Sequence, residues 1–185
     1  LGLYACSREE PAIGQPDLAP QHTVVHEVTD GLLVAGSLQA LERVVMNLVG
    51  NAAKYSPDDT RITVVVRANK GRAELLVDDQ GPGMPPDKLE DIFSRFYSDR
   101  PQTDSTVGKN SGLGLSISRE IITAYGGTIQ ASNLQAGNGA VASPPGEPAA
   151  FRDRRALGIV GARFTVRLPT AEVAASKGAQ LGRRG

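Results

Sequence analysis

The chain has 185 residues, and its 20 Lys and Arg residues balance 20 Asp and Glu residues, so the formal net charge is zero. This length suits one domain with a sizeable core, and the balanced charge gives no sign of a nucleic acid or an anionic membrane surface as partner. The single cysteine, Cys6, excludes an internal disulfide and fits a reducing cytoplasm, and two histidines leave no credible zinc site.

The first predicted elements are short. Residues 1–20 contain three prolines and no hydrophobic periodicity, so segment 1–21 is predicted to be a linker or a loosely docked lead-in. Apolar runs at 22–27 and 32–35 flank an Asp-Gly turn and predict a small hairpin. Ser37 is a good N-cap for the helix that follows. No apolar run reaches about 18 residues, so no membrane span is predicted.

The next helix, predicted to end near Tyr55, has two faces of different chemistry. Asn47, Asn51 and Lys54 recur at helical spacing and form a polar stripe. It lies beside an apolar stripe of Leu41, Val44, Val45, Leu48 and Ala52. Amide oxygens suit Mg²⁺, an ammonium attracts phosphate, and the Tyr55 ring could cover a flat base. For this helix alone, a solvated polar face is the more common explanation.

The middle of the chain predicts a hairpin, a short helix and a long loop. Residues 61–68 alternate between apolar and polar side chains, and 73–78 return after an Asn-Lys-Gly turn. Apolar residues in 89–96 recur at helical spacing and predict a short helix. Residues 97–111 are polar and aperiodic, which is typical of a mobile lid. A further helix is predicted over 113–125, where two glycines end it.

The last third of the chain predicts two strands separated by an insertion. The strands are expected at 128–132 and 162–168. The Gly-, Pro- and Ala-rich residues 134–160 are expected to form a protruding hairpin or a disordered arm, and 170–185 a disordered tail. The elements together predict an α/β (α+β) two-layer sandwich, with a mixed, mostly antiparallel sheet, three helices on one face and a mobile lid.

Two glycine-bearing segments could carry chemistry. Asp79, Gly81 and Gly83 follow a predicted strand, where a carboxylate can accept a hydrogen bond from the exocyclic amine of adenine. This D-x-G-x-G pattern alone is weak, because strand-end Asp-Gly turns are common. Residues 108–115 are rich in glycine and open a helix, whose unpaired N–H groups and dipole can bind an anion. That segment alone fits a flexible hinge equally well.

Taken together, these segments resemble the catalytic domain of bacterial sensor histidine kinases. The sequence NLVGNAAKYS is similar to their N box, DDQGPGM to the G1 box, IFSRFY to the F box and GKNSGLGLSIS to the G2 box. The segment GARFTVRLP resembles their closing strand. The resemblance covers about residues 22–169, which are expected to form the catalytic ATP-binding domain. It implies the Bergerat ATP-binding fold, which DNA gyrase and the MutL mismatch-repair proteins share.

The resemblance also implies roles for individual residues. Asn51 would ligate Mg²⁺ with Asn47 close by, Lys54 would hold phosphate, and Tyr55 would pack on the adenine that Asp79 selects. Phe93 and Phe96 would anchor the lid, and Arg95, Arg100 and Lys109 are weaker candidates for charge near the γ-phosphate. The remaining residues expected to contact the nucleotide are Gly81, Gly83, Gly112, Leu113, Gly114 and Leu115.

The expected activity is transfer of the γ-phosphoryl group of ATP to a histidine on a separate dimerisation domain, for relay to a response regulator. His26 does not fit that acceptor, because valines around it indicate a strand and no proline follows. The chain is therefore expected to be a cytoplasmic portion of a larger, membrane-anchored receptor. Two alternatives are a nucleotide-binding module that transfers nothing and an ATPase of the gyrase type. Asn47 disfavours the ATPase, because ATP-hydrolysing relatives carry a Glu there as general base.

Overall fold

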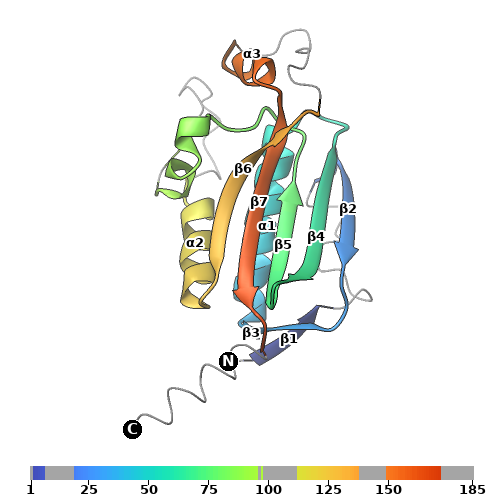
Figure 1. The fold of residues 1–185 in the computed structure, drawn as a ribbon, viewed down its shortest axis with the longest axis vertical. Coiled ribbons are helices and arrows are strands. Elements are labelled where there is room, and N and C mark those ends of the chain that lie inside the picture. The colour runs from blue at the N-terminus through green and yellow to red at the C-terminus, as the bar shows by residue number, and fades with distance from the viewer. Residues whose placement is uncertain (1, 7–18, 96, 98–111, 138–148, 172–185) are drawn as a thin grey trace.

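The computed structural model describes residues 2–6, 19–95, 97, 112–137 and 149–171 (Figure 1). Most of the predicted lid and the predicted tail lie outside these residues. The described elements are β1 (Gly2–Cys6), β2 (Thr23–Val28), β3 (Leu32–Gly36), α1 (Leu38–Tyr55), β4 (Arg61–Asn69), β5 (Arg72–Asp78), the 3₁₀ turns η1 (Pro86–Lys88) and η2 (Asp91–Phe93), α2 (Gly114–Ala124), β6 (Thr128–Gln135), α3 (Ala149–Ala156) and β7 (Ile159–Pro169).

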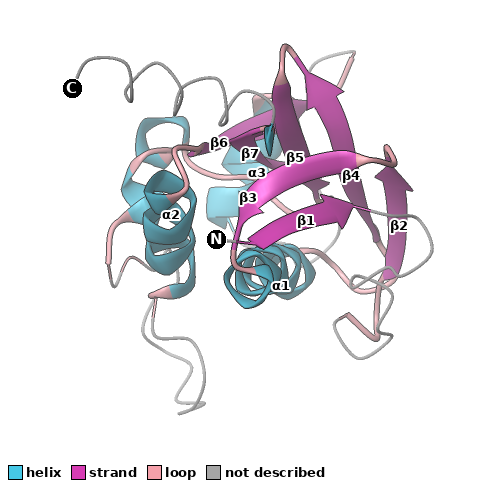
Figure 2. Ribbon diagram, turned by 90° about the horizontal axis from the view of Figure 1, so that it is seen from below, coloured by secondary structure: helices cyan, strands magenta, loops and turns pink. Residues whose placement is uncertain are grey.

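A five-stranded sheet in the order β2-β4-β5-β7-β6 forms one layer of the fold. Strand β2 runs parallel to β4, and the other neighbours are antiparallel, which confirms the predicted mixed sheet. Figure 2 shows α1 and α2 together on one side of this sheet, whereas α3 lies beyond its end in Figure 1. The two-layer sandwich is therefore confirmed. None of the described helices is both long and apolar enough to span a membrane.

The hairpin of β4 and β5 follows directly from its sequence. Ile62 and Val64 alternate with more exposed residues along β4, and both are fully buried against the helices. Lys70 and Gly71 form the two-residue turn, and both have positive φ, at 51° and 73°. Such turns match the right-handed twist of paired strands, so the local sequence specifies both the turn and the register.

The core lies between the sheet and the apolar stripe of α1. The helix begins after Ser37, whose side chain accepts a hydrogen bond from the backbone N–H of Ala40. Its buried residues belong to one core cluster with apolar side chains of β4, β5 and α2. They are Val44, Leu48, Val49 and Ala52, and the cluster includes Ile62, Val64, Val77 and Ile122. With its apolar side toward the sheet, α1 turns its polar stripe to the space between α1 and α2.

The uncovered face of the sheet carries a hydrogen-bonded charge network. Glu74 is only 1% exposed and accepts hydrogen bonds from Arg67, Asn69 and Arg167, at 2.8, 3.1 and 2.8 Å. Burial opposes ionisation of Glu74, but these three donors outweigh it and hold the pKa of its carboxyl below the usual value. The network satisfies a carboxylate that none of the described helices covers.

The predicted hairpin over 22–27 and 32–35 is wrong. Gly31 does turn the chain with φ of 79°, but the two strands pair with different partners. Strand β2 pairs with β4, and β3 pairs with β1 in a separate two-stranded sheet. Val24 thereby joins the apolar face of the main sheet, which an isolated hairpin would not have allowed. The lead-in, for which no strand was expected, supplies β1.

Two further expectations differ from the structure. Residues 89–95 form no α-helix: the 3₁₀ turn η1 begins before them, at Pro86, and within them only η2, Asp91–Phe93, is helical. The insertion at 134–160 is shorter than expected, because β6 extends to Gln135 and β7 starts at Ile159. Part of its described residues, Ala149–Ala156, forms α3, whose alanines and arginines favour a helix. The third helix is therefore α3.

Candidate functional site

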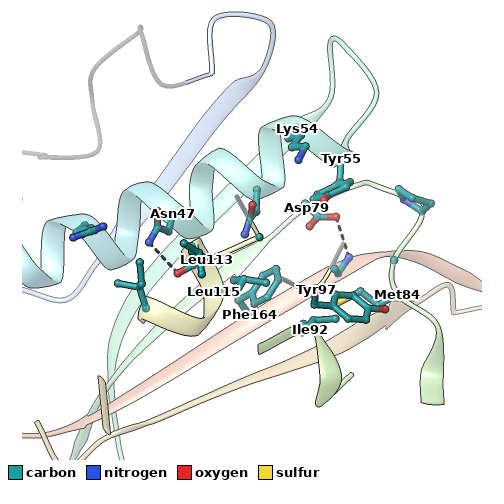
Figure 3. A pocket seen from close by; sticks show the side chains of 18 residues that line it. Asn47, Lys54, Tyr55, Asp79, Met84, Ile92, Tyr97, Leu113, Leu115 and Phe164 are labelled. Atoms are coloured by element: carbon teal, nitrogen blue, oxygen red, sulfur yellow. Dashed lines mark hydrogen bonds between the residues drawn. The ribbon is translucent and has the colours of Figure 1, made fainter. Parts of the chain in front are cut away.

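A cavity of about 380 Å³ opens between α1, the turn after β5, η2 and the start of α2 (Figure 3). Ten residues predicted from the sequence line it. They are Asn47, Asn51, Lys54, Tyr55, Asp79, Gly83, Gly112, Leu113, Gly114 and Leu115. Three segments that are far apart in the chain thus converge on one space.

The polar stripe of α1 forms one wall of the cavity. Asn47 donates hydrogen bonds through its side-chain Nδ2 to the carbonyl of Gly114 and to the hydroxyl of Ser118, both at 3.1 Å. This residue therefore ties α1 to the first turn of α2. Asn51, one turn further along, makes no hydrogen bond to the part of the chain that the structure describes. Its amide group is available to a ligand in the cavity.

Lys54 and Tyr55 lie at the C-terminal end of the same wall. The Lys54 ammonium is 5.0 Å from the centre of the Tyr55 ring. Tyr55 is 36% exposed although it lines the cavity, so a large part of its ring faces solvent. Such a ring is a surface on which a flat, apolar group can pack.

Asp79 is buried at the base of the cavity and is held by backbone groups. Its Oδ1 accepts hydrogen bonds from the N–H groups of Gly81, at 2.9 Å, and Ala162, at 3.0 Å. The backbone N–H of Asp79 in turn donates to the carbonyl of Ala162 at 3.0 Å. Its Oδ2 has no hydrogen-bond partner among the described residues. One carboxylate oxygen is thus fixed while the other can meet a ligand.

The burial of Asp79 changes its acidity. Loss of solvation raises the pKa of its carboxyl from 3.8 to about 6, and the nearby charge of Asp78 contributes in the same direction. The N–H groups of Gly81 and Ala162 act against this rise, because they stabilise the charged form. At neutral pH the group is largely ionised and can accept a hydrogen bond from an amino group.

The glycines after Asp79 are needed for close packing. Gly83 has φ of 68°, and a Cβ there would lie 2.3 Å from Cγ2 of Ile159. Gly81 does not line the cavity, but a Cβ on it would lie 2.8 Å from the carbonyl oxygen of Tyr55. Gly81 therefore lets the turn pack against the end of α1. A larger residue at this position is expected to displace Asp79.

Of the remaining predicted residues, the described Phe93 and Arg95 do not line the cavity. Phe93 is buried in the core, edge-on to Phe164 with 6.4 Å between ring centres. Arg95 is exposed and pairs with Glu120 at 2.7 Å. Phe96, Arg100 and Lys109 lie outside the described residues. The expected contacts of these five residues with a nucleotide or a lid stay predictions.

Several lining residues were not singled out from the sequence. Arg43 precedes Asn47 by one helical turn, so the spacing of the polar stripe could have identified it. The others lie within the segments that resemble the G1, F and G2 boxes and the closing strand, but no role at the site was predicted for them. They are Pro82, Met84, Ile92, Tyr97, Ile117, Ala162 and Phe164. Figure 3 shows Met84, Ile92 and Tyr97 grouped on the side of the cavity away from Lys54.

The described residues contain no cluster of three or more His, Cys, Asp or Glu side chains that could hold a metal ion alone. The cavity instead combines a cation, neutral amides, one buried carboxylate, an aromatic ring and a glycine-led helix start. Backbone N–H groups at such a helix start favour an anion. The arrangement suits a ligand with an amine-bearing flat ring at one end and phosphates at the other.

Comparisons with known proteins agree with this arrangement. Residues 36–172 match the family described as histidine kinase-, DNA gyrase B- and HSP90-like ATPase. Over 141 residues the chain is 38% identical to the sensor protein ChvG of Agrobacterium fabrum, covering 76% of this chain and 20% of that protein. Over 117 residues it is 36% identical to the signal transduction histidine-protein kinase/phosphatase MprB of Mycobacterium leprae, covering 63% and 21%. The chain spans about a fifth of the length of these relatives.

Solved structures give the same result. The mycobacterial sensor histidine kinase MprB superposes with a TM-score of 0.62 at 29% identity, covering 84% of this chain and 86% of that chain. Full-length ShkA in complex with AMPPNP superposes with a TM-score of 0.58 at 25% identity, covering 83% of this chain and 28% of that one. The chain therefore belongs to the histidine kinase-, DNA gyrase B- and HSP90-like ATPase family, as an ATP-binding domain of the kind that sensor histidine kinases carry.

Proposed function

We propose that this domain binds Mg·ATP in the cavity and that the intact protein transfers the γ-phosphoryl group to a histidine of a dimerisation domain. The observation that carries the proposal is the convergence of the α1 polar stripe, Asp79 and the start of α2 on one space. The ShkA structure, which contains an ATP analogue, supports a nucleotide in a domain of this fold.

The different chemistry at the two ends of the cavity indicates how the nucleotide would be oriented in it. The free carboxylate oxygen of Asp79 would accept a hydrogen bond from the adenine amino group, with the Tyr55 ring against the base. The phosphates would then extend along α1 toward Gly112 and Gly114, where the helix start favours anions. Lys54 and Arg43 add positive charge along this path. Adenine and triphosphate would thus occupy opposite ends of the cavity.

The side chains present also fit a magnesium ion that arrives with the nucleotide. The Asn51 amide makes no hydrogen bond to a described residue and offers a neutral oxygen, while phosphate oxygens and water would complete the shell. When bound, Mg²⁺ neutralises phosphate charge. The residues of this chain then contribute mainly by fixing the nucleotide in position, since phosphoryl transfer needs orientation and charge neutralisation rather than covalent help.

Asn47 supports transfer to a protein acceptor over hydrolysis. Both amide hydrogens of its side chain are used in the contacts with α2, and an amide cannot take a proton from an attacking water. The acceptor histidine, the response regulator that would receive the phosphoryl group and the anchoring of the intact receptor in the inner membrane belong to this proposal. The domain itself would lie on the cytoplasmic side.

The test is titration with a fluorescent ATP analogue, with and without Mg²⁺. We expect binding that strengthens with Mg²⁺, and we expect Asn51→Ala to abolish the Mg²⁺-dependent part while the fold is unchanged. The matched control is Glu42→Ala, which alters an exposed residue of the same helix. Normal Mg·ATP affinity in Asn51→Ala would remove this residue as a metal ligand.

A second experiment separates a kinase from a module that only binds nucleotide. The domain is mixed with a separately expressed dimerisation domain and labelled ATP, and phosphohistidine is measured. Formation of phosphohistidine supports the kinase, and none above background supports the binding module. Sustained phosphate release by the domain alone would instead indicate the gyrase type of ATPase.

A further inference from the structure

The insertion between β6 and β7 contacts the nucleotide cavity from outside. Arg154, in the inserted helix α3, is only 8% exposed, and its Nη1 donates a hydrogen bond to the carbonyl of Gly83 at 2.9 Å. Its guanidinium also lies 5.3 Å from the centre of the Phe151 ring on the same helix. Gly83 lines the cavity, whereas Arg154 does not. The inserted helix therefore reaches the wall of the site without entering it.

Asn133, near the end of β6, holds the next residue of the same wall. Its Oδ1 accepts a hydrogen bond from the N–H of Met84, and its Nδ2 donates to the carbonyl of Met84, both at 2.8 Å. One side chain thus pairs with both backbone groups of Met84, as a neighbouring strand would. Met84 lines the cavity, and Asn133 stays behind it.

These three hydrogen bonds matter because no regular element fixes the Gly83–Met84 turn. Residues 79–85 belong to no helix or strand, and Gly83 adopts a backbone conformation with φ of 68°. A segment of this kind has many alternative conformations, and each one that moves Met84 changes the shape of the cavity. The turn follows directly on Asp79 to Gly81, so its position also affects the carboxylate.

We propose that Asn133 and Arg154 are positioning residues that hold the Gly83–Met84 turn as the adenosine-side wall of the cavity. The inference rests on the proposed nucleotide binding and adds to it which residues outside the cavity determine its affinity. The turn follows directly on Asp79, which is proposed to bind the adenine amine, and Met84 lies beside Ile92 and Tyr97 (Figure 3), so the turn is placed beside the base rather than the phosphates. The insertion, whose role the sequence left open, thereby acts on the base end of the site.

The test measures displacement of a fluorescent ATP analogue by ATP, ADP and inorganic tripolyphosphate. We expect Arg154→Ala and Asn133→Asp each to lower the affinities for ATP and for ADP by the same factor, about tenfold. This is the size of effect expected when a buried group loses one hydrogen bond. Asn133→Asp keeps the size of the side chain and an acceptor for Met84 N–H, but loses the donor. Tripolyphosphate, which lacks adenosine, is expected to bind within about twofold of wild type in both variants.

Three controls accompany these variants. Arg152→Ala removes an exposed arginine from the same helix and is expected to leave all affinities unchanged. Ser132→Ala changes an exposed residue of β6 next to Asn133 and is likewise expected to leave all affinities unchanged. Arg154→Lys keeps a charged donor, so it is expected to recover part of the ATP affinity lost in Arg154→Ala. Thermal unfolding of every variant shows whether it is folded.

Each result decides between distinct outcomes. Wild-type ATP affinity in folded Arg154→Ala and Asn133→Asp would overturn the proposal, and so would an equal loss for tripolyphosphate, which indicates general damage. If Arg154→Ala does not fold, Arg154→Lys and Asn133→Asp decide in the same way. A wild-type chain that binds no nucleotide would overturn the proposed function, and this inference with it. In that case faster amide exchange at Met84 in Asn133→Ala would still establish the contact itself.

Discussion

Asp79 is the residue at which stability and function conflict most directly. Its carboxylate is buried, which is unfavourable for a charge, yet one of its oxygens faces the cavity where a ligand can use it. The two backbone N–H groups on Oδ1 compensate only in part, because the pKa stays near 6. Residues that bind ligands through buried charge often lower the stability of the free protein in this way.

The raised pKa of Asp79 predicts how stability changes with pH. The folded state binds the proton more tightly than the unfolded chain, so the contribution of Asp79 to the free energy of unfolding falls as pH rises from about 4 to about 6. Asp79→Asn removes this dependence and is expected to stabilise the protein at neutral pH by up to about 3 kcal/mol. Urea unfolding at about pH 4 and about pH 7 measures the effect. The exposed Asp58→Asn serves as the control.

The same substitution is expected to damage selection of the base. In Asp79→Asn the side-chain oxygen can still accept from Gly81 and Ala162, which turns an NH₂ group toward the adenine amine. Two donors then face each other, so ATP affinity is expected to fall about 10- to 100-fold while the weak binding of GTP changes little. Competition titrations with both nucleotides provide the measurement. A variant that is less stable and binds ATP normally would contradict both predictions for Asp79.

Among the elements, α1 and α2 are joined at the site by one side chain. Asn47 supplies two hydrogen bonds to the first turn of α2, at Gly114 and Ser118. Asn47→Ala is expected to reduce the free energy of unfolding by about 1–3 kcal/mol, because a partly buried carbonyl and hydroxyl lose a donor. Chemical denaturation is the measurement, with exposed Glu42→Ala expected to stay within about 0.5 kcal/mol of wild type.

Two glycines on different elements are expected to respond in opposite directions. A Cβ at Gly161 in β7 would lie 2.0 Å from the carbonyl oxygen of Asp79, so Gly161→Ala must push the strand away from the turn. For Gly161→Ala we expect the free energy of unfolding to fall by about 1–3 kcal/mol and ATP binding to weaken. A Cβ at Gly50 in α1 would meet nothing within 4 Å, so Gly50→Ala is expected to raise the free energy of unfolding by about 0.5–1 kcal/mol. Thermal and urea unfolding of both variants test the contrast.

At the scale of the whole molecule, ligand binding and folding are linked. A ligand that binds only the folded chain stabilises it by about 2.7 kcal/mol at 100 times its dissociation constant. For a domain of this size, that corresponds to a rise in Tm of about 5–10 °C with Mg·ATP. A thermal scan measures the rise, and chelation of Mg²⁺ is expected to reduce it. Asn51→Ala is expected to show the reduced rise with or without the chelator.

The sequence predicted those parts of the molecule that depend on local pattern. Helix α1 and the β4–β5 hairpin follow from periodicities of about 3.6 and two residues, and the motifs predict Asn51, Asp79 and Gly112, which all line the cavity. The pairing of β2 with β4 could not be predicted, because either edge of β2 offers the same backbone groups. The apolar wall around Met84 was not predicted either: Met84, Ile92 and Tyr97 lie in the segments that resemble the G1 and F boxes, but only the tertiary fold shows that these side chains meet at the cavity.

Strand β7 is the last of the strands that the structure describes, yet it is paired on both sides, with β5 and with β6. It also supplies Ala162 and Phe164 to the cavity. During synthesis on the ribosome, the edge of β5 that pairs with β7 stays unpaired until residues 159–169 have left the exit tunnel. The nascent domain therefore cannot bind nucleotide before β7 is in place. Until then the unpaired edges of β5 and β6 are exposed, and these are the surfaces that a chaperone would have to cover.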